Sequence, residues 1–447
     1  ALGVFPGGEV ASFSARQRAV VEAAWSPVIG GLIQRTKAWV LPIFVEGRNS
    51  LLFQSAGLMH PRLRTALLCR EMLRAQDRTI RLHVGEVLSP ESMERFSEAK
   101  ELIDHLRVRT ELLRPRRKGD RKTNARPIHV AEQLPAIEEM PATEELVAEL
   151  DSLGESATLA RSDRLRVVAF YGHERPKLMR AIGIARERTF RTVGEGSGFS
   201  IDTDRYDPHY LQLMLWDDDQ RCVAGGYRLG MSDKLVEQHG REALYTFSLF
   251  KYRRRLLSQI GPALELGRSF VCTEYQKSYS PLMLLWRGIG GVVAANPQYR
   301  RLFGPVSISA EYSSISRELL VKFLTVNTYL PMLGKLSRPR NPLYPMPRRS
   351  MNRAPLSRVV SDLDEVNQLI SELESDGKAM PVLLRQYLKL NAKLLAFSVD
   401  PDFSNVVDGL MLVDLTQVDR RILDRYLGKE HAEAFLSHHQ PAEEMAT

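Results

Sequence analysis

The chain has 447 residues, of which 44% are hydrophobic and 26% charged, and its formal net charge is +8. This length predicts two or three domains with ample apolar material for a core. No run of eighteen apolar residues occurs, which excludes a transmembrane helix of ordinary length. No zinc-finger, helix-turn-helix or RNA-binding signature accompanies the positive charge. We therefore expect no nucleic acid as a partner, and we expect an acidic protein or an anionic membrane surface instead.

Residues 1–104 alternate predicted helices and strands and form the first predicted domain. Apolar residues recur at helical spacing over 15–35, and 38–45 is a short β-rich run. The segment 51–58 is apolar, and the segment 62–74 is amphipathic. In the segment 79–84 apolar and polar residues alternate, as in a half-buried strand.

Residues 105–160 are predicted to be a linker that contains one helix. The basic run Arg114–Lys122 is followed by several prolines, and Thr143–Leu153 has acids in its first turn as helices favour. The basic run predicts a solvated linker, and contact with anionic lipid head groups is the functional alternative.

The second predicted domain covers 161–430, with a tail over 431–447. The patterns predict strands and helices that are listed here in chain order: strand 165–171, helix 176–190, strands 210–216 and 222–229, strand 264–271, helix 280–296, strand 303–308, helices 313–326, 359–373 and 382–390, and strand 410–415. The segment 335–355 is rich in Pro and Arg, and it predicts an exposed basic loop inserted into this domain.

Charged residues recur inside the apolar elements of the second domain. Glu265 and Arg268 lie in a predicted buried strand, where an unpaired charge costs several kcal/mol (about 3–5). The other members of the set are Arg186 and Phe190 (RERTF), Asp204 and Asp207 (DTDRYD), and Arg228 (GGYRL). This order and spacing resembles the acyl-homoserine-lactone synthases and the ornithine-lipid type N-acyltransferases of the GNAT superfamily. The segment Val382–Leu390 resembles the closing part of the latter group.

The resemblance implies a role for each of these residues. Glu265 would be the general base for the acceptor amine, or would orient it, and an ion pair with Arg268 is the structural alternative. Asp204 and Asp207 would hold the acceptor amino group, although DTDRYDP is also good turn chemistry. Arg186, Arg228 and Arg268 can each bind a carboxylate.

The acyl donor implied by the resemblance is a thioester of acyl carrier protein (ACP). The segment Cys272–Ser280 has no glycines where coenzyme A-dependent GNAT enzymes carry a glycine-rich loop. A helix starting near Ser280 still offers N–H groups to one phosphate, so Ser278 and Ser280 are candidates for phosphopantetheine binding. We expect acyl-ACP or acyl-CoA as co-substrate, and no permanently bound cofactor.

A second resemblance covers the start of the chain. The segments Phe5–Ser12 (FPGGEVAS) and Val40–Ser50 (VLPIFVEGRNS) are similar to two sequence blocks of the glycerolipid (lysophosphatidate-type) acyltransferases, although Glu9 comes two places later than that family's acid. The resemblance implies that Phe5, Gly8, Glu9, Glu46 and Arg48 bind the acceptor's polar head. The family's catalytic HxxxxD block is expected upstream of residue 1, so this domain would be an incomplete O-acyltransferase.

Two further classes of site are not expected. The histidines show no metal-ligand pair on a common face, so we predict no metal. No GxSxG elbow occurs and no histidine lies near Cys272 in the sequence, so we predict direct attack on the thioester without a covalent intermediate.

The combined expectation is an α/β protein with a truncated glycerolipid-acyltransferase domain followed by a GNAT-like mixed α/β domain. It would move a 3-hydroxy fatty acyl group from ACP to an amino acid such as ornithine or glycine and give a lyso-lipid, in the cytoplasm at the inner face of a membrane. Two alternatives remain open: an acyl-CoA-dependent GNAT enzyme acting on a small amine, and a non-catalytic protein that binds a membrane surface.

Overall fold

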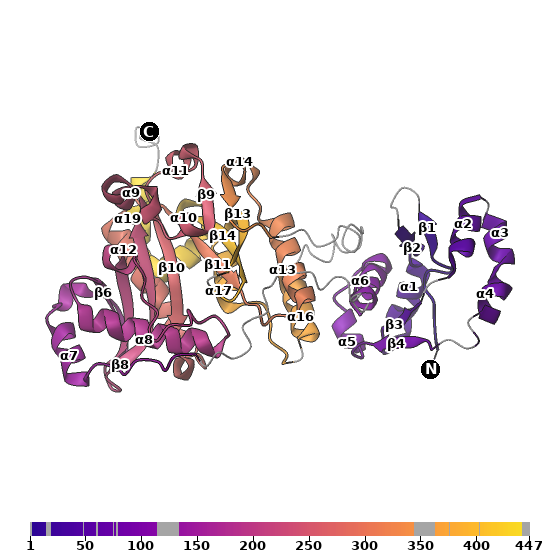
Figure 1. Ribbon diagram of the computed structural model, residues 1–447, viewed down its shortest axis with the longest axis horizontal. Coiled ribbons are helices and arrows are strands. Elements are labelled where there is room, and N and C mark those ends of the chain that lie inside the picture. The colour runs from indigo at the N-terminus through magenta and orange to yellow at the C-terminus, as the bar shows by residue number, and fades with distance from the viewer. Residues whose placement is uncertain are drawn as a thin grey trace. The chain divides into compact units, whose positions relative to one another are not determined.

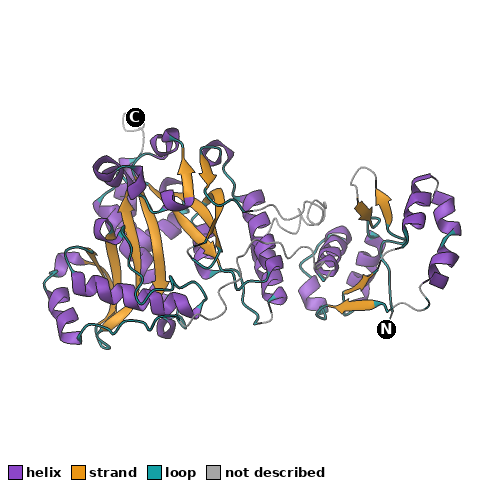
Figure 2. Cartoon of the chain, viewed as in Figure 1, coloured by secondary structure: helices purple, strands orange, loops and turns teal. Residues whose placement is uncertain are grey.

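The chain divides into two units in the computed structural model, which describes residues 2–14, 19–47, 49–59, 61–74, 76, 79–113, 134–343, 363–374, 376–401 and 403–439 (Figure 1). The first unit comprises Ala1–Thr123 with Pro345–Lys378, and the second comprises Asn124–Tyr344 with Ala379–Thr447. Both units mix helices and strands, as Figure 2 shows. The predicted mixed α/β class is therefore confirmed.

The first unit is built on two small antiparallel sheets and a set of short helices. Its strands are β1 (Ser12–Ser14) paired with β2 (Ala19–Val21), and β3 (Ile43–Glu46) paired with β4 (Arg81–Val84). Its helices are α1 (Pro27–Thr36), α2 (Leu51–Met59), α3 (Pro61–Ala66), α4 (Leu68–Arg74), α5 (Pro90–Met93), α6 (Ala99–Leu112) and α16 (Leu363–Leu373). The predicted helix over 15–35 is wrong in its first half, because Ala19–Val21 pairs as a strand and Pro27 begins the helix.

The predicted boundary at residue 104 falls inside α6. Leu102, Ile103 and Leu106 of this helix are core residues of the first unit. The helix α16 belongs to the same unit, because His105 Nδ1 lies 2.7 Å from Glu365 Oε1. The first unit therefore extends beyond residue 104. It also includes α16, which comes much later in the sequence.

The second unit is organised around an eight-stranded sheet in the order β13-β14-β11-β10-β8-β7-β6-β5. The pair β10–β11 is parallel and the other neighbours are antiparallel. The strands are β5 (Thr158–Ser162), β6 (Leu165–Tyr171), β7 (Leu211–Asp217), β8 (Cys222–Met231), β10 (Ala263–Val271), β11 (Arg301–Ile308), β13 (Lys393–Asp400) and β14 (Val406–Asp414). Of these, β5 and β13 were not predicted.

Helices cover both faces of this sheet, as adjacent residues of β7 show. Met214 packs in one cluster with Ile182 of α8 (Pro176–Thr192), whereas Leu213 lies against Gly288 of α12 (Ser280–Ala295). Successive residues of a strand point to opposite faces, so α8 and α12 lie on opposite sides of the sheet. Figure 1 shows α8 crossing the strands at one end of the sheet.

Shorter elements complete the second unit. They are α7 (Thr143–Asp151), α9 (Ser232–His239), α10 (Thr246–Leu249), α11 (Arg254–Ile260), α13 (Ser314–Asn327), α14 (Pro331–Gly334), α17 (Val382–Lys389), α18 (Arg420–Leu427), α19 (Lys429–His438), and the short helical turns at Glu155–Ala157, Asp207–His209, Arg241–Ala243, Thr273–Tyr275 and Leu415–Gln417. The helix predicted in the linker, α7, is not a linker element, because Leu146 and Leu150 pack in the core beside α8.

Part of the segment that was predicted to be an irregular loop is a strand. β12 (Ser337–Pro339) pairs with β9 (Phe250–Tyr252). Proline is tolerated here because the pair forms a two-stranded edge, where a missing N–H costs little. The rest of the loop from residue 344, and the basic run Arg114–Lys122, lie outside the described residues.

The two parallel strands at the centre of the sheet separate soon after they meet. β10 pairs with β11 only from Ala263 to Glu265, opposite Arg301–Phe303. One step further, a Cβ on Gly304 would lie 2.1 Å from the carbonyl oxygen of Leu266. Beyond this contact β10 shifts its register against β8 between Gly267 and Phe270, and Arg268 adopts φ 50°. The sheet is therefore opened at the segment that carries Arg268.

No helix in the described part of the chain is both long enough and apolar enough to span a bilayer.

Candidate active site

A buried cluster of arginines and aspartates lies where β10 leaves β11. Arg186 projects from α8, Arg228 from β8, and Asp202, Asp204 and Asp207 from the segment between α8 and β7. Arg186 Nε lies 2.8 Å from Asp202 Oδ2, and Arg186 Nη2 lies 3.0 Å from Asp207 Oδ2. Arg228 Nη1 lies 2.6 Å from Asp204 Oδ1 and 2.9 Å from Asp207 Oδ1. The structure thus brings together four of the residues predicted from the sequence.

The most deeply buried arginines of the cluster are neutralised by the aspartates beside them. The side chains of Arg186 and Arg228 are 1% and 0% exposed. Burial alone would raise the pKa of Asp207, but the charges of Arg186 and Arg228 hold it well below its ordinary value. Both arginines are therefore committed to aspartates, and removing either would leave a buried carboxylate unpaired at a cost of about 3–5 kcal/mol.

The aspartates also form the turn that their sequence allowed. The backbone N–H of Tyr206 donates to Asp204 Oδ1 at 2.8 Å, and the N–H of Asp204 donates to Asp207 Oδ2 at 2.8 Å. Asp207 is 2% exposed. The geometry gives Asp207 a structural role and does not favour the prediction that it holds the acceptor amine. Asp204, with its side chain 20% exposed, is the more accessible of the two.

Arg268 differs from the two deeper arginines. Its Nη1 and Nη2 lie 3.5 Å from Asp202 Oδ2 and 3.4 Å from Asp204 Oδ2, which are longer contacts than those of Arg186 and Arg228. Its side chain is 11% exposed, and its guanidinium stacks over the rings of Tyr245 and Phe403 at 5.4 and 4.9 Å. A guanidinium that is held by stacking and only loosely paired keeps donors for an incoming carboxylate.

Glu265 is completely buried and accepts four hydrogen bonds. The donors are the hydroxyls of Tyr210 and Thr246 and the backbone N–H groups of Tyr245 and Thr246, the last at 3.1 and 2.7 Å. Burial raises the pKa of Glu265, and the hydrogen bonds from Thr246 and Tyr210 oppose this shift without cancelling it. An ionised carboxylate has about four acceptor sites, and all four are used here.

This arrangement gives Glu265 a positioning role. It fixes the backbone of Tyr245 and Thr246, and the ring of Tyr245 in turn lies 5.1 Å from the guanidinium of Arg228 and 5.4 Å from that of Arg268. A general base needs a free lone pair within reach of the proton. The geometry therefore does not favour the predicted role of general base, nor the predicted Glu265–Arg268 ion pair, since Arg268 pairs with aspartates.

The predicted donor-binding residues lie at the start of α12. Ser280 is the first residue of this helix, and its backbone N–H donates to Ser278 Oγ at 3.2 Å. Both serines are exposed. The pKa of the nearby Tyr279 is raised by burial and lowered by the charges of Arg385 and Arg425, so these two arginines lie close to the same helix end. Together they make an electropositive surface for a phosphate.

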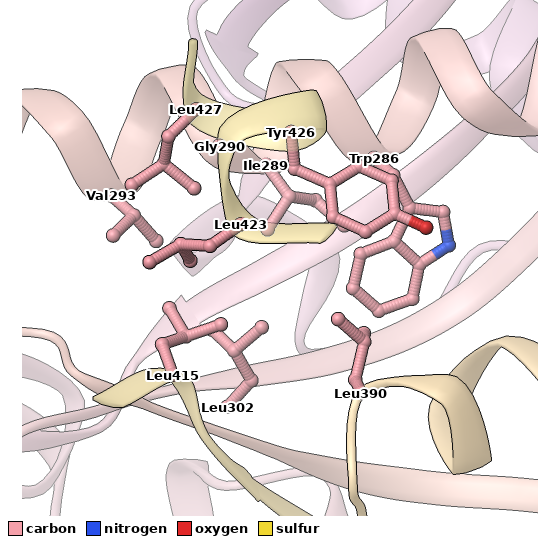
Figure 3. Close-up of a pocket in the computed structure, with 10 residues that line it drawn as sticks. All are labelled: Trp286, Ile289, Gly290, Val293, Leu302, Leu390, Leu415, Leu423, Tyr426 and Leu427. Atoms are coloured by element: carbon pink, nitrogen blue, oxygen red, sulfur yellow. The ribbon is translucent and has the colours of Figure 1, made fainter. Parts of the chain in front are cut away.

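A small apolar pocket lies beside α12, on the face opposite to the cluster. Trp286, Tyr426 and aliphatic side chains line it, with the Trp286 and Tyr426 rings 5.6 Å apart at one end (Figure 3). The space open to a water-sized sphere is about 10 Å³, which is about the size needed for one water molecule. In this conformation the pocket has no room for an acyl chain.

The predicted residues of the first unit are divided between two places. Phe5 and Gly8 form an exposed turn in which Gly8, with φ 64°, donates its N–H to the Phe5 carbonyl, and Glu9 follows it. Glu46 lies on β3 and pairs across the sheet with His83 at 3.4 Å. Arg48 lies outside the described residues. Their predicted role in binding a lipid head group stays a prediction.

Several residues of the site were missed from the sequence. Asp202, Tyr210, Tyr245 and Thr246 all bond to the predicted residues, but they are common residue types in segments without a distinctive spacing. Asp202 carried the one usable signal, because it precedes Asp204 in the same acidic turn (DTDRYD).

Two findings bear on the chemistry of the site. Burial raises the pKa of Cys272 to about 12, so its thiol is protonated at neutral pH and is a poor nucleophile. Within the described residues, no group of three or more His, Cys, Asp or Glu side chains is arranged to hold a metal ion.

Comparison with known proteins assigns the class of reaction. A family model described as "Acetyltransferase (GNAT) domain" matches residues 185–287, which span Arg186, Asp204, Asp207, Arg228, Glu265 and Arg268. The chain is 29% identical over 282 residues to a glycine N(alpha)-acyltransferase of Phocaeicola vulgatus, covering 60% of this chain and 83% of that protein. It is 28% identical over 286 residues to the protein of the same name from Bacteroides thetaiotaomicron, covering 60% and 82%. No solved structure matches the chain significantly.

The protein is an acyltransferase with a GNAT acetyltransferase domain. This confirms the predicted superfamily of the second domain and the predicted enzyme class.

Proposed function

We propose that the protein transfers a fatty acyl group from a phosphopantetheine thioester to the amine of an amino acid, with glycine as the first candidate acceptor. The observation that carries the proposal is Arg268, the one arginine of the buried cluster that is loosely paired and partly exposed. An amino acid presents a carboxylate at one bond from its amine-bearing carbon. Binding that carboxylate at Arg268 would place the amine beside the opening between β10 and β11.

The choice of glycine rests on the names of the two relatives, which act on glycine. Ornithine is the second candidate, from the resemblance of the polar motifs to the ornithine-lipid type N-acyltransferases. Either acceptor would give an N-acyl amino acid, which is a lyso-lipid when the acyl chain is long.

For the donor we propose acyl-ACP, with acyl-CoA as the alternative. The support is the electropositive start of α12, where Arg385 and Arg425 lie close to Tyr279, and the net charge of +8, which suits an acidic carrier protein. The segment Cys272–Ser280 has no glycine to bring its backbone close to a pyrophosphate. The phosphopantetheine of ACP carries a single phosphate, which the N–H groups at one helix start can bind without such a glycine-rich loop.

The product would be delivered to a membrane, so we also propose peripheral binding to an anionic membrane surface. This part of the proposal rests on the basic runs of the sequence, which lie largely outside the described residues.

Mass spectrometry of total lipids from cells that express the chain tests the proposal. We expect new N-acyl glycine species, which disappear in an Arg268→Ala variant. N-acyl ornithine in place of N-acyl glycine would reassign the acceptor. A lipid profile identical to that of cells carrying an empty vector, with the protein present and folded, would contradict the proposed function.

A further inference from the structure

The saturation of Glu265 leaves the proposed reaction without a base, and a second carboxylate lies on the same face of the sheet. Asp408 is on β14, where it stands opposite Ser307 of β11 and Ser398 of β13. Two and four residues further along β14, Leu410 and Leu412 share a core cluster with Ala263 of β10 and Tyr210. Because side chains alternate along a strand, Asp408 points to the face that carries Glu265.

Asp408 is buried but is not saturated. It is 2% exposed, and the Ser307 hydroxyl donates to its Oδ1 at 2.7 Å. Within the described ranges, no other hydrogen-bond donor and no Lys or Arg within ion-pair distance meets its carboxylate. This contrasts with Glu265, whose two oxygens accept from four donors.

The charged groups that act on Asp408 are mainly acidic. The charges of Asp400 on β13 and of Glu195 after α8 raise the pKa of Asp408, and the charge of Arg268 on β10 lowers it. Arg268 is already shared with Asp202 and Asp204. Three arginines face three aspartates in the cluster, and among the described residues no Lys or Arg lies within ion-pair distance of Asp408. A buried carboxylate without a cation beside it is stabilised by an incoming ammonium.

Asp408 also lies within electrostatic reach of the predicted acceptor site. Asp408 and Asp400 raise the pKa of the Tyr245 hydroxyl, after the larger effect of burial, and Arg268 lowers it. The Tyr245 hydroxyl is thus within electrostatic range of both Arg268 and Asp408. An amino-acid zwitterion, which carries a carboxylate and an ammonium a few ångströms apart, matches this pairing of Arg268 with Asp408.

We propose that Asp408 is the catalytic carboxylate that receives the proton of the acceptor ammonium; this rests on the proposed N-acyl transfer. Asp408 takes one proton from the ammonium. The amine nitrogen then uses its lone pair to form the C–N bond to the thioester carbonyl carbon. The tetrahedral oxyanion collapses, the C–S bond breaks, and the thiolate leaves with the electron pair. The nitrogen loses a second proton, which the thiolate takes up to give the thiol, and Asp408 releases its proton to solvent.

The protonation behaviour of Asp408 is suited to this task. Burial, together with the charges of Asp400 and Glu195, raises its pKa to about 8, against the opposing effects of Ser307 and Arg268. Burial and the charge of Glu311 raise the pKa of Glu195 to about 7, while Ser309 opposes the shift. A base whose pKa lies near the working pH combines availability with driving force for proton transfer.

The test compares Asp408→Asn with wild type in N-acylation of glycine by acyl-ACP from pH 6 to 10. Asparagine still accepts from Ser307, so the variant should fold. We expect a rate about a hundredfold lower near pH 7, the usual share of a general base. The deficit should shrink steadily as pH rises, because free amine then enters from solution and needs no base. Asp414→Asn is the matched control, since Asp414 is on the same strand but pairs with Arg300 and Arg301.

The outcomes separate the two proposals. A wild-type enzyme that acylates glycine, with an Asp408→Asn rate within about threefold of it and an unchanged pH profile, overturns the role of Asp408 alone. A constant deficit at every pH, equal to that of Asp414→Asn, also overturns it and indicates a structural effect. A folded wild-type protein that acylates neither glycine nor ornithine overturns both proposals.

Discussion

At the scale of single residues, the site separates two carboxylates that a sequence cannot distinguish. Glu265 stands in the most conspicuous motif, yet its oxygens are filled by Tyr210, Tyr245 and Thr246. Asp408 stands in an apolar strand without a motif and keeps an oxygen for a ligand. Sequence patterns identify buried charges, whereas the count of donors around each charge requires the fold.

Glu265→Gln is expected to destabilise the fold. The amide N–H₂ of glutamine would face hydroxyl and N–H donors, and at least one buried donor would be left unsatisfied at a cost of about 1–3 kcal/mol. Urea unfolding measures the loss. Glu237→Gln on the exposed side of α9 is the control and should unfold as wild type does. A Glu265→Gln protein with wild-type stability and a hundredfold lower rate would instead return Glu265 to the role of base.

Arg268→Lys is expected to weaken acceptor binding selectively. Lysine keeps the positive charge but loses the planar fork that binds a carboxylate with two hydrogen bonds. We expect the KM for glycine to rise about tenfold or more, the effect of losing one charge-assisted hydrogen bond of about 1.5–3 kcal/mol. The KM for acyl-ACP should stay within about twofold of wild type. An equal rise of both KM values would argue against a carboxylate at Arg268.

Asp408 should also make stability depend on pH in a specific direction. The pKa of Asp408 in the folded state is about 8, which is above the ordinary value of about 3.9. Between these two pH values the folded state therefore holds a proton that the unfolded state has released. Its contribution to stability is therefore present below about pH 4 and is lost as pH rises towards 8. The Asp408→Asn variant does not lose stability in this way as pH rises. The difference between its Tm and that of wild type should therefore increase by several degrees, about 4 °C or more, between pH 5 and 9. A Tm difference independent of pH would show that Asp408 is ionised normally.

At the scale of elements, the backbones of β10 and β11 approach closely at Gly304, just beyond the last paired residues of the two strands. Gly304 on β11 lies where a Cβ would meet the Leu266 carbonyl oxygen at 2.1 Å, a backbone atom that cannot move aside. Gly267 on β10 has room, with the nearest atom of Tyr245 at 3.7 Å. We therefore expect Gly304→Ala to lower stability by about 3 kcal/mol or more, and Gly267→Ala by less than about 1 kcal/mol. Thermal melts of both variants decide this, and equal losses would contradict the described register.

The elements show how far hydrophobic patterning extends. β6 was predicted at its observed bounds, Leu165–Tyr171, and α12 and α17 within one residue, because each combines strong periodicity with Pro or Asn at an end. The pairing of β10 with β11 and its early end were not predictable. They arise from long-range register, from the left-handed backbone of Arg268, and from the close approach at Gly304. β13 was missed, although its residues (KLLAFSVD) suit a strand.

At the scale of the whole molecule, the net charge of +8 predicts salt-sensitive binding to anionic membranes. Exposed basic residues act on a charged surface within a Debye length, about 10 Å at 0.1 M salt and roughly half that at about 0.5 M. Co-sedimentation with vesicles containing anionic lipid should therefore occur at low salt and fall sharply at 0.5 M. Vesicles of neutral lipid are the control. Binding that does not change with salt would contradict an electrostatic mode.

The candidate active site lies in only one of the two units of the chain. The site described above lies in the second unit, whose residues 185–287 match the GNAT family model. The first unit has its own core around Leu102, Ile103 and Leu106, and its resemblance to the glycerolipid acyltransferases stays a prediction. We expect purified protein to show no O-acyl transfer to a lyso-lipid, since no HxxxxD block is present in the chain.

The most direct test of the central claim is single-turnover transfer by the purified protein from acyl-ACP to isotopically labelled glycine, followed by mass spectrometry. We expect one N-acyl glycine to form for each thiol released, and we expect acyl-CoA to be a poorer donor than acyl-ACP. Arg268→Lys should slow the reaction at low glycine concentrations and recover as glycine is raised. Release of thiol without labelled amide, or labelled amide formed equally well from amines that have no carboxylate, would contradict the claim.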